Sequence, residues 1–86
     1  MYQIVLSSSF QKKVKALVKR DPKLKKELIK TIKLLRRDLK HPSLRLHKLS
    51  GQNNWSISVS RNVRIIIHWE EDILYCTKIG NHDEVY

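Results

Sequence analysis

Cysteine, glycine and proline are scarce in this 86-residue chain, which has one, two and two of them. The lone Cys76 excludes an internal disulfide, so we expect a cytoplasmic protein that folds by packing alone. No run approaches the ~18 continuous apolar residues of a membrane span, and the apolar start at 1–6 is too short for a signal-peptide core. A chain of this length holds one hydrophobic core, which predicts a single domain over 1–86.

Acidic residues are also few, with 8 Asp and Glu against 18 Lys and Arg, for a formal net charge of +10. Residues 1–50 hold 15 of the basic residues and 3 of the acidic ones, whereas residues 51–86 hold 3 and 5. Lysines on a single helix are explained by a solvated face, but a half-domain of this charge concentrates polyanions around it. Nucleic acid, an acidic protein and an anionic membrane surface are the partners that the charge allows.

The basic half is predicted to begin with a strand at 2–6 and a first amphipathic helix. Ser8 and Gln11 form a capping-box pattern, with Ser8 as the N-cap residue and the Gln11 side chain reaching back to it. The apolar stripe of this helix consists of Phe10, Val14, Leu17 and Val18.

A second helix is predicted after a short junction, so that the two helices form an antiparallel hairpin. Asp21 is expected at its N-cap and Pro22 at its first position. His41 precedes Pro42, and the residue before a proline avoids helical geometry, so the helix is expected to end there. Its apolar stripe consists of Leu24, Leu28, Ile32, Leu35 and Leu39.

From Trp55 onward the apolar residues alternate with a period of two, which predicts strands at 55–59 and 63–69 after a basic connection. A three-residue loop at 60–62 pairs Val59 with Val63 and places every large apolar residue on one face, whereas a two-residue loop would divide them between faces. The opposite face then carries Ser56, Ser58, Arg64, Ile66 and His68.

A last strand is predicted at 73–79, after an acidic turn and before Gly80. It is apolar on both faces, so the pattern leaves its two sides unassigned. The expected fold is α+β with the order β-α-α-β-β-β, in which a helical hairpin covers one face of a small, mainly antiparallel sheet.

Arg64 lies in the middle of a strand among isoleucines. One interpretation is a structural ion pair with Glu70 or Asp83. The other is a phosphate clamp, because a guanidinium offers two parallel donors to phosphate oxygens.

His82 follows a strand end and a glycine, where functional side chains often collect, and is a candidate catalytic residue. Tyr86 is the aromatic residue best placed to stack on a base. His47 and His68 are weaker candidates, and His41 is the weakest. The histidines and the single cysteine form no zinc-ligand pattern, so no metal is expected.

Three segments in the second half of the chain form a recognisable set, Leu46–Gly51, Asn62–Ile67 and Ile79–Tyr86. The last segment is the most specific and contains the pattern Gly-x-His-x-x-x-Tyr. With the element order, these segments resemble the RelE/ParE superfamily of toxins from bacterial and archaeal toxin–antitoxin pairs. The resemblance implies a RelE/YafQ-like mRNA interferase, a ribosome-dependent endoribonuclease that cuts mRNA in the A site. ParE-like members share the fold but poison DNA gyrase, so the alternative is a non-catalytic gyrase poison or a basic nucleic-acid-binding module.

The resemblance also implies roles for individual residues. His82 matches the position where many members place a His or Arg near the scissile phosphate. Tyr86 matches an aromatic that orients the nucleotide, and Arg64 matches a strand arginine that holds phosphate. His47 matches a histidine of YafQ-like members, although Lys48 replaces the proline that follows it there.

The chain departs from these relatives at two places. Ser56 and Ser58 stand where RelE has lysines, and the additional histidine and acid of YafQ-like members near Ser58 and Asn62 are absent. The general base therefore stays unassigned.

The mechanism expected from this resemblance is attack of a ribose 2′-OH on the adjacent phosphate, which needs no metal or cofactor because the nucleophile belongs to the substrate. In this mechanism Arg64 stabilises charge, His82 serves as general acid or base with His47 as its partner, and Tyr86 orients the base. RNA contacts are expected from Arg45, Lys48, Arg61, Lys25, Lys26, Lys30 and Lys33. The expected partners are an acidic cognate antitoxin, the ribosome and mRNA, with DNA reached only through the antitoxin complex, in a prokaryotic cytoplasm and without a membrane.

Overall fold

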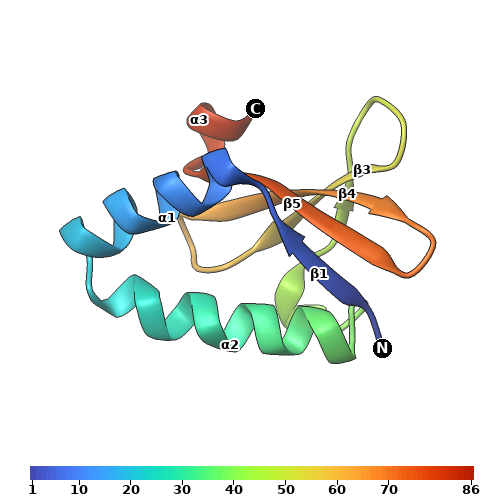
Figure 1. The fold of residues 1–86 in the computed structure, drawn as a ribbon, viewed down its shortest axis with the longest axis horizontal. Helices are drawn as coiled ribbons and strands as arrows, with labels where there is room; N and C mark the ends of the chain where they lie inside the picture. The colour runs from blue at the N-terminus through green and yellow to red at the C-terminus, as the bar shows by residue number, and fades with distance from the viewer.

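The computed structural model describes all residues, 1–86, and has the expected α+β architecture. Two long helices form a hairpin along one face of a five-stranded sheet (Figure 1). The elements are β1 (Gln3–Leu6), α1 (Ser8–Arg20), α2 (Lys23–Arg37), the 3₁₀ turn η1 (Pro42–Leu44), β2 (His47–Lys48), β3 (Asn54–Ser58), β4 (Arg64–Glu70), β5 (Ile73–Gly80) and α3 (His82–Val85). The predicted order is confirmed, and β2 and α3 are additional to it. None of the helices has the length and apolar character needed to cross a membrane.

The strand order is β1-β5-β4-β3-β2. β1 pairs with β5 in parallel and every other pair is antiparallel, so the mainly antiparallel sheet is confirmed. β4 therefore lies between β5, which leads into α3, and the β3–β2 pair. This order decides which distant segments of the chain meet.

The start of α1 corrects one prediction, because the N-cap is Ser7 rather than Ser8. The backbone of Ser7 is extended, and its hydroxyl accepts a hydrogen bond from the Phe10 N–H at 3.1 Å. Gln11 does reach back, but its amide donates to the Leu6 carbonyl at 3.1 Å. Three successive serines offer alternative cap positions, and the pattern alone did not distinguish them.

The start of α2 is one residue later than predicted, because the helix begins at Lys23 and its N-cap residue is Pro22 rather than Asp21. The Asp21 carboxylate still accepts from the Lys23 N–H at 3.2 Å. The predicted end near His41 is wrong, because α2 ends at Arg37. After α2 comes a turn in which the His41 N–H donates to the Asp38 carbonyl, and η1 follows this turn. This path buries both Leu39 and Leu44 against the core.

The β3–β4 hairpin has the predicted register. Ser58 lies opposite Arg64 and Trp55 opposite Ile67, and the Val59 N–H donates to the Val63 carbonyl at 2.9 Å. A three-residue loop therefore joins the strands. The predicted apolar face packs on the helices, with the side chains of Ile57, Ile65 and Ile67 fully buried.

A bulge explains why Ile79 in β5 is out of alternation with Leu74 and Cys76. Ile66 pairs with Lys78 but Ile67 pairs with Cys76, so Thr77 is the extra residue, and its hydroxyl donates to the Ile66 carbonyl at 3.2 Å. The inward face consequently passes from Leu74 and Cys76 to Ile79. Burial raises the pKa of the Cys76 thiol to about 12, so the thiol stays protonated and unreactive.

Candidate functional site

The polar candidates lie on the face of the sheet that the helical hairpin leaves open. Side chains alternate along each strand, so the residues between those that face the helices point to this other face. His47 lies opposite Ser56 across β2 and β3, and Arg64 lies opposite Ser58 across β3 and β4. Three neighbouring strands thus present His47, Ser56 and Arg64 on one side.

The Arg64 side chain is half-buried and is held by three acceptors. Its Nε donates to the Ser56 hydroxyl at 2.6 Å and to the Tyr86 hydroxyl at 3.1 Å, and its Nη2 donates to the Arg45 carbonyl at 3.1 Å. Ser56 is fully buried, and the bond from Arg64 satisfies its hydroxyl oxygen. These bonds fix the plane of the guanidinium and leave its Nη1 group without a protein acceptor.

Arg64 has no carboxylate within ion-pair distance, so the interpretation as a partner of Glu70 or Asp83 is wrong. Glu70 pairs instead with His68 Nε2 at 2.7 Å, and Asp83 lies 3.8 Å from His82 Nδ1. The positive charge of Arg64 is therefore not neutralised by the protein and is available to an anion.

Helix α3 begins with the candidate His82 and ends just before the candidate Tyr86, and it was not predicted. Its N-cap is Asn81, whose side chain accepts from the Glu84 N–H at 2.8 Å while the Glu84 carboxylate accepts from the Asn81 N–H at 3.1 Å. This is a capping box, and the pattern Asn81-x-x-Glu84 in the sequence would have indicated it. Such a short helix is marginal by itself and needs anchoring.

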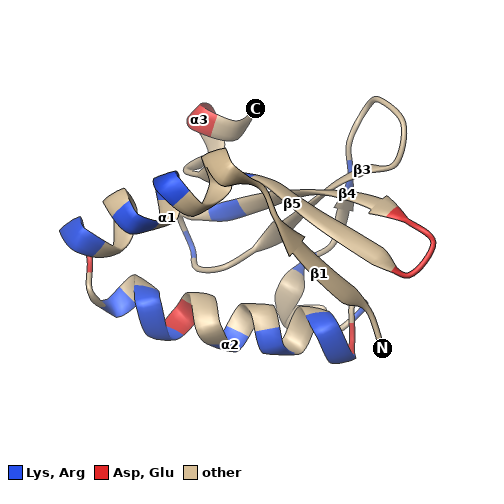
Figure 2. Cartoon of the chain, in the orientation of Figure 1, with Lys and Arg blue, Asp and Glu red and all other residues tan.

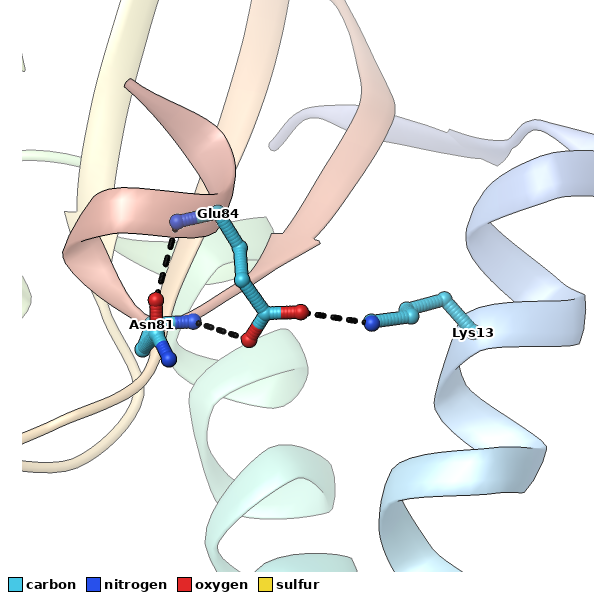
Figure 3. Close-up of polar contacts among 3 residues, drawn as sticks. All are labelled: Lys13, Asn81 and Glu84. Atoms are coloured by element: carbon cyan, nitrogen blue, oxygen red, sulfur yellow. Dashed lines mark hydrogen bonds and ion pairs between the residues drawn. The ribbon is translucent and has the colours of Figure 1, made fainter.

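An ion pair with α1 supplies that anchor. Lys13 Nζ lies 2.7 Å from Glu84 Oε2, so α3 is tied beside the first turns of α1 (Figures 1 and 3). The hydrogen bond from Lys13, followed by that from the Asn81 N–H, lowers the pKa of Glu84. Val85 is buried under the same helix. The buried Val85 and this partly exposed ion pair together hold α3, which carries His82 and leads into Tyr86, beside α1.

The His82 and Tyr86 rings lie one helical turn apart and meet edge to face, with centroids 4.3 Å apart. The His82 side chain is 74% exposed, and Tyr86 is 47% exposed. The Tyr86 hydroxyl also accepts from Arg64, so the end of the chain is joined to the centre of the sheet. Both rings remain accessible to a ligand.

An open cavity of about 610 Å³ brings the candidates together. Its lining consists of Arg45, His47, Leu49, Arg64, His82 and Tyr86. All four residues that the sequence suggested as catalytic line it, together with one of the suggested RNA-binding residues. Leu49 in the wall and Ser56 beneath Arg64 were not predicted, and neither has a distinctive local pattern.

The other suggested RNA-binding residues lie away from this cavity. Lys48 points to the opposite face, where its Nζ lies 5.0 Å from the centroid of the Trp55 ring. Arg61 is exposed in the β3–β4 loop, and Lys25, Lys26, Lys30 and Lys33 are exposed on α2. Figure 2 shows Lys and Arg along α1 and α2 and acidic residues in the β4–β5 turn. The basic helical surface and the cavity are thus separate features.

The cavity combines guanidinium groups with imidazoles and a phenol. A guanidinium can hold phosphate oxygens, and an imidazole can transfer a proton near neutral pH. No group of three or more His, Cys, Asp or Glu side chains is arranged to hold a metal ion.

Solved toxin structures have the same fold. YafQ in the E. coli DinJ–YafQ complex is 21% identical, with a TM-score of 0.84 over 100% of this chain and 99% of that one. A metal-bound toxin from Helicobacter pylori is 25% identical, with a TM-score of 0.79 over 100% of both chains. A YoeB/ParE toxin from Agrobacterium tumefaciens is 15% identical, with a TM-score of 0.76 over 93% of this chain and 98% of that one. No protein-family model and no curated protein matches the sequence. The chain has the fold of the RelE/YafQ-like toxin superfamily, as its closing segments suggested.

Proposed function

We propose that the protein is the toxin of a toxin–antitoxin pair and acts as a ribosome-dependent endoribonuclease on mRNA. The observation that carries the proposal is the cavity in which His47, Arg64, His82 and Tyr86 converge around a guanidinium without a carboxylate partner. The likeness to YafQ, described in complex with DinJ, supports the toxin and antitoxin part of the proposal.

The proposed reaction is an internal displacement at phosphorus. The 2′-oxygen of a ribose attacks the adjacent phosphate, the new O–P bond forms, and the bond from phosphorus to the 5′-oxygen breaks. A base takes the 2′-OH proton and an acid protonates the 5′-oxygen that leaves. The products are a 2′,3′-cyclic phosphate, or the 3′-phosphate to which it hydrolyses, and a 5′-hydroxyl end.

Four side chains of the cavity have a task in this scheme. Arg64 directs its remaining N–H donors at the phosphate and stabilises the charge that develops there. The strand order places β4 between α3 on one side and β2 on the other, so His82 and His47 flank Arg64. An acid and a base on either side of the phosphate suit an in-line displacement. Tyr86 orients the nucleotide by stacking.

The exposed lysines of α1 and α2 are proposed to dock the toxin on ribosomal RNA. Contacts of this kind go to phosphates, so they position the protein without reading sequence. An acidic antitoxin would cover the same charge in the inactive complex, and DNA would be reached only through that complex.

The test is translation in a cell extract, with the ends of the mRNA mapped by primer extension. We expect cuts at codon-defined positions with the wild-type protein and none with His82→Ala. The matched control is His68→Ala, because His68 lies outside the cavity and bonds to Asn54 and Glu70. Intact mRNA together with stalled replication would replace this proposal with the gyrase-poison alternative. Cuts that survive His82→Ala would contradict the proposed site.

A further inference from the structure

A second cavity of about 590 Å³ lies beyond the end of α2, on the helical side of the sheet. Its apolar walls come from Pro42, Leu46, Trp55 and Trp69, and the polar side chains that line it are Lys40, His41 and Arg45. Its volume is within the ordinary range for a ligand site.

The two tryptophans give this cavity a fixed aromatic surface. Their ring centroids are 5.5 Å apart, and Tyr2 packs edge-on against Trp69 at 5.7 Å. The Trp69 Nε1 donates to the Glu71 carbonyl at 2.8 Å, and Lys48 lies over the Trp55 ring. The rings are half-buried and held by neighbours, so a ligand base would find a surface that is already arranged.

The two sides of the tryptophan pair carry opposite charges. Lys40 and Arg45 stand on one flank, whereas Glu70 and Glu71 line a separate hollow on the other flank of the same rings. A polyanion is therefore attracted from the flank of Lys40 and Arg45 and repelled from the acidic one.

Arg45 connects this cavity to the candidate active site, since it lines both. Its backbone is in the left-handed region, with φ of 48°, and its carbonyl is held by Arg64 Nη2 at 3.1 Å. One basic side chain thus stands at the junction between a phosphate-binding group and an aromatic surface.

We propose that the second cavity stacks a base of the same single-stranded RNA whose reacting phosphate lies at Arg64. This inference rests on the proposed function for its ligand and adds a nucleotide subsite to it. Any base can stack on an aromatic ring, because every base has a π face. The subsite would therefore bind the strand without sequence preference.

The chain contains two tryptophans, and both line this cavity and the acidic hollow on their other flank. Their fluorescence therefore reports on both hollows, and the charge variants below assign a change to this cavity. The probe is a 2′-O-methyl hexanucleotide, which cannot undergo 2′-OH attack. We expect it to quench the fluorescence, and an abasic oligonucleotide of the same length to bind about 5- to 100-fold more weakly without quenching. Lys40→Gln and Arg45→Gln should weaken the quenching titration, whereas Lys78→Gln, which removes an equal charge from β5, should not.

Several results would overturn the inference: no quenching, equal quenching by the abasic strand, or equal loss of quenching in Lys78→Gln. Equal quenching by a glutamate-rich peptide would assign the cavity to an acidic protein instead. The titration does not depend on cleavage, so its outcome separates the two proposals. Cleaved mRNA without quenching would contradict only the proposed subsite. Quenching without cleavage in the extract would contradict only the proposed nuclease activity.

Discussion

Replacing Arg64 with alanine tests both the structure and the chemistry of the cavity. The substitution removes hydrogen bonds to Ser56, Tyr86 and the Arg45 carbonyl. The Tyr86 ring is half-exposed, so its hydroxyl can bond to water instead. Ser56 is fully buried, and leaving its hydroxyl without this partner costs about 1–3 kcal/mol of folding free energy. The free energy of unfolding of a native protein is about 5–15 kcal/mol in total, so we expect the variant to fold and to have a lower melting temperature.

The effect on cleavage should be larger than the effect on stability. Removing a donor that stabilises transition-state charge typically lowers the rate by about 10²–10³. We therefore expect Arg64→Ala to lose cleavage in the translation extract by at least that factor, with the far-ultraviolet circular dichroism of the wild type.

The matched variant is Ser56→Ala, which removes the buried acceptor and keeps the cation. Arg64 Nε still has the Tyr86 hydroxyl, so cleavage should fall far less than with Arg64→Ala. A folded Arg64→Ala protein that cleaves at the wild-type rate would refute the proposed role. A collapsed fold would show that Arg64 is mainly structural.

Three further predictions concern α3 and the helical surface. His82→Ala and His82→Gln should lower cleavage by about 10²–10⁴ while ribosome co-sedimentation and antitoxin binding stay near wild type; loss of ribosome binding would make His82 a binding residue. The pKa of Glu84 is lowered by its bonds to Lys13 and Asn81, so its stabilising contribution is present above the ordinary value of 4.5 and is lost as the pH falls through the lowered value. Thermal melts across acidic pH should show this loss in the wild type and not in Glu84→Gln; identical pH profiles would contradict it. Replacing four α2 lysines with Glu should reduce the slope of log binding constant against log salt concentration for the ribosome by roughly 0.7–0.9 per lost phosphate contact. The four are Lys25, Lys26, Lys30 and Lys33. An unchanged slope would show that these lysines are only a solvated surface.

The sequence predicted the parts of the fold that local periodicity determines. The register of the β3–β4 hairpin followed from the single face shared by Ile57, Ile65 and Ile67. The faces of β5 could not be read in this way, because the bulge at Thr77 reverses the alternation within the strand. The two-residue strand His47–Lys48 is too short to show any period.

The site was predicted as a set of residues but not as an arrangement. Arg64, His82, Tyr86 and His47 were identified by residue type and by the resemblance. Their meeting depends on the strand order and on the anchor between Lys13 and Glu84, which are separated by most of the chain. No local pattern contains that information, although the capping box at Asn81 would have indicated α3.

The central claim is that this cavity cleaves mRNA by using the substrate's own 2′-OH. The most direct measurement places a single 2′-deoxynucleotide at the mapped cut in an mRNA, and analyses the fragment ends after translation with the wild-type protein. The account predicts a 2′,3′-cyclic phosphate or 3′-phosphate and a 5′-hydroxyl on the all-ribose message, and no cut at the 2′-deoxy position. Cleavage at the 2′-deoxy position, or fragments with 5′-phosphate and 3′-hydroxyl ends, would contradict it.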